Sequence, residues 1–161
     1  MKTNILIAVD WSKSAMNGVQ YVADLLKNQQ DVSVTLLHVF NPYPYAPPFD
    51  AAPLESRGNF EHEKKAWEAT EREHGEKCLE RAKTMLTTAG FTEQQIQTKN
   101  IKPIQPEYDT AEEILNESEQ GNYNTIVLGK RGLSRVQVFL TGSVTEKIVR
   151  HAKGHAVWVI E

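Results

Sequence analysis

Short apolar runs alternate with longer amphipathic segments along the chain. Residues 4–10, NILIAVD, are almost entirely apolar and end on an aspartate, which is typical of a strand buried on both faces of a sheet. The runs 32–40, 124–129 and 156–161 have the same character, and a weaker strand is expected near 97–102. Strands that alternate with helices predict βαβ units. The expected fold is therefore α/β, with a mostly parallel sheet covered by helices on both faces.

Helical periodicity fills the segments between these runs. Ser12 is expected to cap the first helix. The apolar positions of that helix are Ala15, Val19, Val22, Ala23 and Leu26. A long charged helix is expected over 60–89, with Gly90 ending it. Its inward stripe is predicted to be Trp67, His74, Cys78, Ala82, Met85 and Ala89. Thr110 and Glu113 are expected to form the capping box of a third helix.

A proline-rich stretch at 41–59 interrupts this pattern, and it is expected to be a loop within a single domain spanning 1–161. Residues 41–53 hold five of the seven prolines together with three aromatic residues. Proline cannot continue a helix or a central strand. Two interpretations stay open: a polyproline-like connecting loop, or a lid or docking segment for a partner.

Composition narrows the classes of protein that the chain can belong to. A length of 161 residues suits one domain, and a net charge of −3 disfavours a protein that coats nucleic acid or an acidic membrane. The sequence contains no apolar run of membrane-spanning length and begins with a strand pattern rather than a signal peptide. Cys78 is the only cysteine, so a disulfide within the chain is excluded. A cytoplasmic protein that binds neither nucleic acid nor membrane is expected.

The glycines of the stretch 129–143, GKRGLSRVQVFLTGS, have a spacing that suits neither a helix nor a strand. Gly129 ends a predicted strand, Gly132 follows it, and Gly142 comes directly before Ser143, where a helix is expected to begin. Glycine lets a ligand approach the backbone closely, and a helix N-terminus attracts anions. Cationic side chains are added by Lys130, Arg131 and Arg135. The stretch therefore predicts a phosphate site, although simple turns and caps remain the alternative reading of each glycine.

Parallel α/β sheets bind ligands beyond the carboxyl ends of their strands, where the strand order reverses. The residues at such positions here are Asp10, the segment 39–41 and Gly129. His38 lies inside a predicted strand and is expected to be a hydrogen-bonded core histidine rather than a ligand. The glycine spacing matches neither a Walker A loop nor the Gly-x-Gly-x-x-Gly of dinucleotide-binding folds.

The pattern Gly-x-x-Gly, nine residues, Gly-Ser resembles the nucleotide-binding signature of the universal stress protein family, in its ATP-binding branch. Further similar segments are ILIAVDWSKSA (5–15), TLLHV (35–39), IVLGKRG (126–132) and LTGSVTEKIVRHA (140–152). The chain departs from the family in PIQPEYD (103–109), where a Gly-x-Pro turn is common. Ala156 replaces the usual proline, and Lys130 replaces a frequent serine.

This resemblance implies a three-layer sandwich with a five-stranded parallel sheet of order 3-2-1-4-5, of the adenine nucleotide alpha hydrolase-like type. It also implies that the chain binds ATP, with Mg²⁺. The residues that would contact the nucleotide are Val9, Asp10, Val39, Leu128, Gly129, Lys130, Arg131, Gly132, Gly142, Ser143 and Val144. Asp10 would repel phosphate, but it can accept hydrogen bonds from ribose hydroxyls or reach phosphate through Mg²⁺.

The function expected from these features is that of a small ATP-binding regulator that responds to stress or energy state, with slow or no hydrolysis. A nucleotide-independent dimerisation or partner-binding module of the same fold is the alternative. The run at the end of the chain consists of Ala156, Val157, Trp158, Val159 and Ile160. An apolar edge strand invites pairing, and family members commonly dimerise through it, so a homodimer is expected here. Shielding of this edge by the preceding helix is the other possibility.

Overall fold

The computed structural model describes residues 2–41, 43, 54–103, 109–130 and 143–161. Arg131, Gly132 and Gly142 of the glycine-rich stretch therefore lie outside the described residues.

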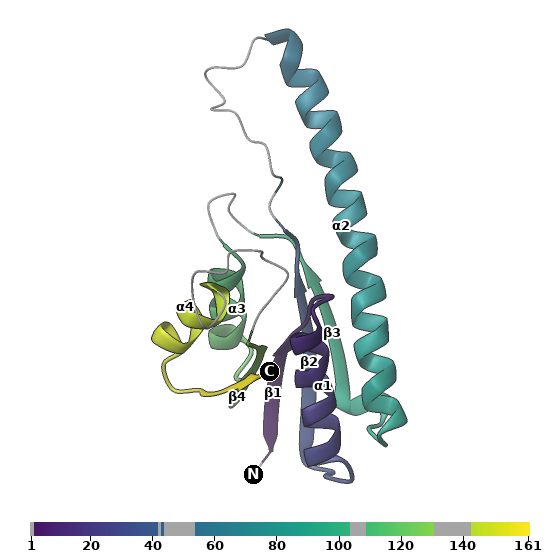
Figure 1. The fold of residues 1–161 in the computed structure, drawn as a ribbon, viewed down its shortest axis with the longest axis vertical. Helices are drawn as coiled ribbons and strands as arrows, with labels where there is room; N and C mark the ends of the chain where they lie inside the picture. Colours follow the sequence, from purple (N-terminus) through teal and green to yellow (C-terminus); the bar gives the residue numbers. More distant parts are fainter. Residues whose placement is uncertain (1, 42, 44–53, 104–108, 131–142) are drawn as a thin grey trace.

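Five parallel strands form one sheet in the order β3-β2-β1-β4-β5, which confirms the predicted fold class (Figure 1). The strands are β1 (Thr3–Ala8), β2 (Val32–Val39), β3 (Ile96–Ile101), β4 (Thr125–Gly129) and β5 (Ala156–Ile160). The order reverses between β1, which pairs with β2 on one side, and β4 on its other side. The carboxyl ends of β1 and β4 therefore diverge toward different crossover connections, and a crevice opens between them.

Helices cover both faces of this sheet, because successive residues of the central strand point to opposite sides. The helices are α1 (Lys13–Leu26), α2 (Leu54–Thr88), α3 (Thr110–Gln120) and α4 (Ser143–His151), with a short 3₁₀ turn η2 (Glu93–Gln95) before β3. Ile5 and Ile7 of β1 pack in the core that α1 and α2 share, whereas Leu6 packs in the core formed with α3 and α4. All three side chains are fully buried, as the continuous apolar run predicts.

The helix α2 begins at Leu54, so the expected loop at 41–59 is wrong for its last six residues. Nothing in the segment 54–59 stops a helix: it contains no proline, and one glycine costs only about 1 kcal/mol. The first part of α2 extends well beyond the sheet, as Figure 1 shows. Residues 61–65 of this part, EHEKK, are charged or polar, and all of them except the half-buried Lys64 are exposed.

The inward stripe of α2 also differs from the prediction. Cys78 and Ala82 are buried as expected, but His74 is exposed, and Glu71 and Gly75 occupy the inward positions. The four inward residues Glu71, Gly75, Cys78 and Ala82 follow helical spacing. A carboxylate and a glycine are not apolar side chains, so the sequence pattern did not predict them as part of an apolar stripe. A Cβ on Gly75 would lie 2.5 Å from Nδ1 of His38, so the glycine lets α2 approach β2 closely. Among the described helices, none is long and apolar enough to cross a membrane.

The starts of α1 and α3 are capped by side chains. Ser12 accepts a hydrogen bond from the backbone N–H of Ala15 (3.2 Å), as predicted. The capping box of α3 lies one residue earlier than expected: Asp109 accepts from Glu112 N, and Glu112 accepts from Asp109 N, both at 3.0 Å. Glu113, the other candidate, is only 2 % exposed and faces inward. Asp is a strong N-cap residue, and its position sets the start of the helix.

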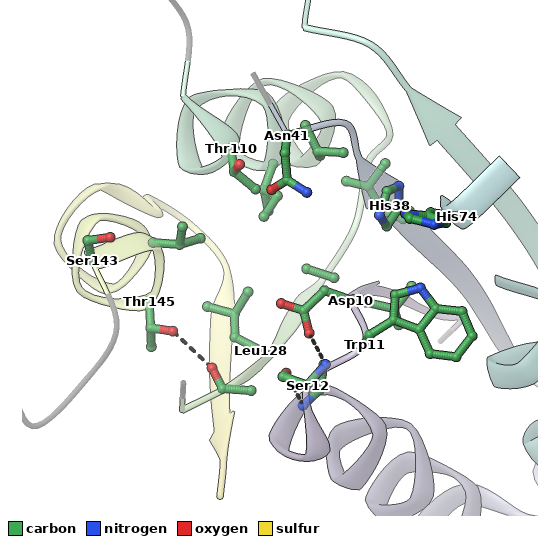
Figure 2. Close-up of a pocket in the computed structure, with 18 of the residues that line it drawn as sticks. Asp10, Trp11, Ser12, His38, Asn41, His74, Thr110, Leu128, Ser143 and Thr145 are labelled. Carbon is green, nitrogen blue, oxygen red and sulfur yellow. Dashed lines mark hydrogen bonds between the residues drawn. The ribbon is translucent and has the colours of Figure 1, made fainter. Parts of the chain in front are cut away.

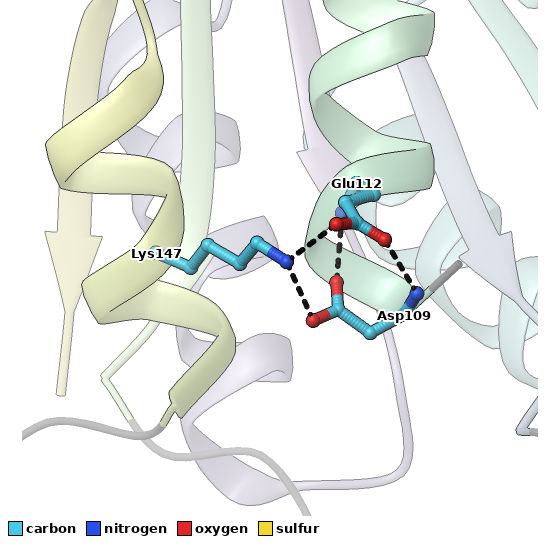
Figure 3. A network of polar contacts seen from close by, with 3 residues as sticks. All are labelled: Asp109, Glu112 and Lys147. Atoms are coloured by element: carbon cyan, nitrogen blue, oxygen red, sulfur yellow. Dashed lines mark hydrogen bonds and ion pairs between the residues drawn. The ribbon is translucent and has the colours of Figure 1, made fainter. Parts of the chain in front are cut away.

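Lys147 of α4 connects this cap to the neighbouring helix (Figure 3). Its Nζ lies 2.9 Å from Asp109 Oδ2 and 2.8 Å from Glu112 Oε1. Hydrogen bonds to these carboxylates raise the pKa of Lys147, and the same contact lowers the pKa of Glu112. Burial acts to raise the pKa of Asp109, but the bonds from Lys147 and from the backbone outweigh it and lower the pKa. The starts of α3 and α4 are thereby held together.

Candidate functional site

A pocket of about 250 Å³ lies at the carboxyl ends of β1, β2 and β4, at the point where the strand order reverses (Figure 2). Seven of the residues expected to bind nucleotide line it: Val9, Asp10, Val39, Leu128, Gly129, Ser143 and Val144. Its volume lies just below the range of about 300–1,000 Å³ that is typical of small-molecule sites. The structure therefore brings most of the described candidates into one cavity.

Lys130 is the described candidate that does not line this pocket. Its Nζ lies 2.9 Å from Glu161 Oε2, and its backbone N–H donates to the carbonyl of Ile160 at 2.6 Å. The lysine therefore contacts the last residue of the sequence, beside β5. Its side chain is about one-third exposed, so its ion pair is weak and open to competition from another anion.

Three helices begin at the pocket. Ser12 at the cap of α1, Thr110 at the first position of α3 and Ser143 at the first position of α4 all line it. A helix N-terminus carries unpaired N–H groups and a partial positive charge. Thr145 Oγ1 donates to the carbonyl of Gly129 (2.9 Å), which fixes the start of α4 against the end of β4. Because Ser12 caps α1 and the carboxylates of Asp109 and Glu112 cap α3, the start of α4 is the one of these three that best suits an anionic group of a ligand.

Gly129 is required for a reason that differs from the one inferred from the sequence. It is not among the described glycines with positive φ, which are Gly90 and Gly154. A Cβ at position 129 would instead lie 2.6 Å from the backbone nitrogen of Ala15 and 2.8 Å from the carbonyl carbon of Ser14. The glycine therefore lets the first turn of α1 pack directly on the end of β4. This contact places two of the three helix starts side by side.

Asp10 follows β1 and lies near the centre of the pocket in Figure 2. Its Oδ1 accepts a hydrogen bond from the backbone N–H of Ser12 (2.8 Å), which orients the carboxylate. A carboxylate held in this way repels phosphate and accepts hydrogen bonds from hydroxyl groups. Behind it, Cys78 is buried, and burial, followed by the charge of Asp10, raises the pKa of the thiol to about 12. This agrees with a cysteine that serves only in packing.

One end of the pocket contains a carboxylate that sequence reasoning missed. Glu71 of α2 is only 5 % exposed, and its Oε2 accepts from both the backbone N and the side-chain Nδ2 of Asn41, each at 2.9 Å. Asn41 lay within the segment expected at the ligand site, but its partner is 30 residues away. Other lining residues that the sequence did not identify are Trp11, His74, Thr110 and Thr145. Their positions depend on tertiary packing rather than on any local pattern.

His38 is buried and hydrogen-bonded as expected, but it also lines the pocket. Its Nδ1 lies 3.0 Å from Asn100 Oδ1, and Asn100 Nδ2 donates to the carbonyl of Arg72 at 2.9 Å. The bond to Arg72 fixes the side-chain amide of Asn100 so that its Oδ1 faces the imidazole of His38. Since Oδ1 can only accept, Nδ1 of His38 must carry the proton. Burial lowers the pKa of His38, so the ring is neutral and Nε2 is an acceptor.

The fold and the pocket define a doubly wound α/β protein with a ligand site at the reversal of strand order. The model of the universal stress protein family matches residues 1–160, and the chain belongs to that family. No curated protein matches the chain.

Solved structures show the same fold. The hypothetical protein MJ0577 is similar with a TM-score of 0.75 and 23% identity, over 99% of this chain and 96% of that one. The universal stress protein UspA from Lactobacillus plantarum has a TM-score of 0.68 and 22% identity, over 99% and 97% of the two chains. A universal stress protein family protein from Arabidopsis thaliana, solved with AMP bound, has a TM-score of 0.60 and 21% identity, over 98% and 90%.

Proposed function

We propose that this universal stress protein binds an adenine nucleotide, ATP with Mg²⁺, and acts as a regulator with slow or no hydrolysis. The observation that supports this most directly is the pocket at the reversal of strand order, which the N-terminus of α4 borders. The similar Arabidopsis thaliana protein contains AMP. The nucleotide-independent module is the alternative.

The distribution of charge in the pocket favours one orientation of the bound nucleotide. Phosphates belong near the start of α4, where Ser143 and Val144 line the pocket and the chain continues from Gly129 and Lys130. The ribose belongs beside Asp10, and the base belongs at the end of β2, next to Val39. Arg131, Gly132 and Gly142 are proposed to complete the phosphate end, while Val9 and Leu128 line the nucleoside.

Mg²⁺ would bind mainly through the phosphates of the nucleotide. Among the described residues no group of three or more metal-binding side chains exists, so a metal site built by this part of the chain alone is not indicated. Mg²⁺ commonly uses substrate phosphates and only one or two carboxylates. Asp10 is the carboxylate placed to supply such a ligand.

Binding of Mg²⁺–ATP is tested by thermal unfolding with and without nucleotide. A ligand that binds only the native state adds about 2.7 kcal/mol of stability at one hundred times its Kd. A folded sample whose midpoint does not move at millimolar Mg²⁺–ATP would contradict the proposal. Gly132→Val and Gly142→Val should reduce the shift, because a branched side chain would meet the phosphates where backbone is expected.

We also propose that the protein forms a homodimer through β5, which lies at the edge of the sheet. Ala156 is exposed, and Val159 is 38% exposed although it is a large apolar residue. An open apolar edge strand is normally paired or covered. Replacement of Val157 and Val159 by lysine should give a monomer in light scattering that still binds nucleotide. A wild-type protein that is monomeric at micromolar concentration would exclude this dimer.

A further inference from the structure

The pocket contains a buried carboxylate whose hydrogen-bonding capacity is only partly used. Glu71 Oε2 accepts both hydrogen bonds from Asn41, while Oε1 makes no hydrogen bond or ion pair within the part of the chain that the structure describes. Of the ion pairs among these residues, none involves Glu71. Oε1 is not among the described buried polar atoms that lack a partner, so it is accessible from the pocket rather than enclosed. A carboxylate has about four acceptor positions, and those of Oε1 are open to a donor from a ligand. Because Glu71 lines the pocket, a ligand can supply the missing donor.

The two bonds from Asn41 hold this carboxylate in one orientation. The donors are a backbone N–H at the end of β2 and a side-chain amide, both 2.9 Å from the same oxygen. Asn41 in turn is held by Trp67, whose indole Nε1 donates to the carbonyl of Asn41 at 3.2 Å. The group that faces the ligand is therefore positioned by contacts on both sides. Such preorganisation is what a selective contact requires.

The ligand atoms that lie here must donate hydrogen bonds and must not be anionic. Glu71 and Asp10 both carry acceptors into the pocket and disfavour phosphate, whereas the helix start at Ser143 favours it. In Figure 2, His38 lies on the side of Asp10 away from Ser143, whereas Asn41 lies above Asp10, near Thr110 in this view. Nε2 of the neutral His38 adds another acceptor on this side. In a nucleotide, the neutral parts that carry donors are the ribose, whose hydroxyls are already assigned to Asp10, and the base, where adenine presents a 6-amino group.

We propose that Glu71, oriented by Asn41, accepts a hydrogen bond from the 6-amino group of adenine and so determines which purine the site binds. This rests on the proposed function, because it concerns the base end of the same nucleotide site. Hypoxanthine carries a carbonyl oxygen at position 6, and this oxygen would face the carboxylate with no proton between them. Sites built around a substrate NH discriminate strongly against analogues that lack it, because a buried polar group is then left unpaired.

The substitution Glu71→Gln tests this assignment by reversing the polarity of one atom. Both N–H groups of Asn41 need an acceptor, so the amide oxygen of the glutamine must take the place of Oε2. Its NH₂ group then takes the place of Oε1 and donates where the wild-type side chain accepts. The variant should therefore disfavour adenine and favour a 6-oxo purine. Loss of one hydrogen bond that involves a charged group typically lowers affinity by about tenfold or more, and a change of this size is expected here.

The experiment measures binding of AMP, IMP and GMP to the wild-type protein and to Glu71→Gln by isothermal titration calorimetry. We expect the wild-type protein to prefer AMP over IMP by about tenfold or more, and the variant to lose most of this preference. Glu73→Gln is the matched control, because Glu73 lies on the same helix, is 65% exposed and pairs with Lys77. The ratio of its affinities for AMP and IMP (the AMP-to-IMP ratio) should equal that of the wild-type protein.

Each other outcome has a distinct meaning. An unchanged AMP-to-IMP ratio in Glu71→Gln would overturn the assignment while leaving nucleotide binding intact. A wild-type preference for IMP or GMP that Glu71→Gln removes would mean that the carboxylate accepts from the N1–H of a 6-oxo purine, which also overturns it. A folded wild-type protein that binds none of the three would refute the proposed function itself. If Glu71→Gln does not fold, Asn41→Ala replaces it and should lower the AMP-to-IMP ratio by releasing Glu71.

Discussion

The contact between α1 and the end of β4 predicts that Gly129→Ala destabilises the protein. The added Cβ would lie 2.6 Å from the backbone nitrogen of Ala15, whereas ordinary contact begins at 3.4 Å. The neighbouring atoms are backbone and a capped helix start, so they cannot rotate away as a long side chain would. Either α1 or β4 must move by most of the difference. Overpacking of this kind typically costs about 1–3 kcal/mol.

The assay is urea unfolding, with Gly58→Ala as the matched control. Gly58 lies in α2, and a Cβ there would meet nothing within 4 Å, so the same chemical change should stabilise by about 0.5–1 kcal/mol. For Gly129→Ala the midpoint should fall while the m-value stays constant, which marks a change in stability rather than in compactness. The thermal shift with nucleotide should also shrink, because Gly129 joins two of the helix starts. A Gly129→Ala protein as stable as the wild type would refute the packing argument.

Three further predictions concern individual residues. Asp109→Ala should destabilise by about 1 kcal/mol in urea unfolding through loss of the α3 cap, and Asp109→Asn, which keeps the acceptor, by clearly less; equal losses would contradict the cap. Burial lowers the pKa of His38 below its ordinary value of 6.5, so the unfolded chain binds protons first as pH falls. The free energy of unfolding should therefore fall from pH 7 to pH 5.5, and His38→Gln should reduce this pH dependence. If the pH dependence is the same in the variant, a group other than His38 causes it. Asp10→Ala should weaken the binding of adenosine and of AMP equally, as measured by calorimetry, because the carboxylate is expected at the ribose. A loss of affinity for AMP alone would mean that Asp10 does not lie at the ribose.

Local sequence patterns predicted four of the five strands because each of these is a self-contained apolar run, whereas β3 is mostly polar and gave only a weak signal. The segment 4–10 is buried on both faces, and such a run needs no knowledge of its neighbours. The cap at Ser12 was likewise predictable, since its partner Ala15 is three residues away. For α3 the sequence DTAEE offers two overlapping capping boxes, and burial of Glu113 selects the earlier one.

The end of the pocket around Glu71 and Asn41 was not predictable in the same way. Glu71 interrupts the apolar stripe of α2, and its contact with Asn41 joins residues 30 apart in the sequence. The bond between His38 and Asn100 spans 62 residues. A buried carboxylate or imidazole gives no periodic signal, because its position is stabilised by a specific partner rather than by hydrophobic burial. Such residues can be identified as part of a site only from the tertiary structure, which brings distant segments of the chain together.

The division of the pocket leads to a last prediction, that base selectivity and phosphate affinity are separable. Glu71 comes from α2 and Asn41 from the end of β2, whereas Ser143 opens α4, and these residues share no contact among those described. Substitutions without shared partners usually have additive free energies. Glu71→Gln should therefore change the AMP-to-IMP ratio but not the ATP-to-AMP ratio, while Ser143→Ala should do the reverse. Calorimetry on the two single variants and the double variant measures both ratios. Strong coupling between them would mean that one group of residues contacts both ends of the nucleotide, and the proposed orientation would then be wrong.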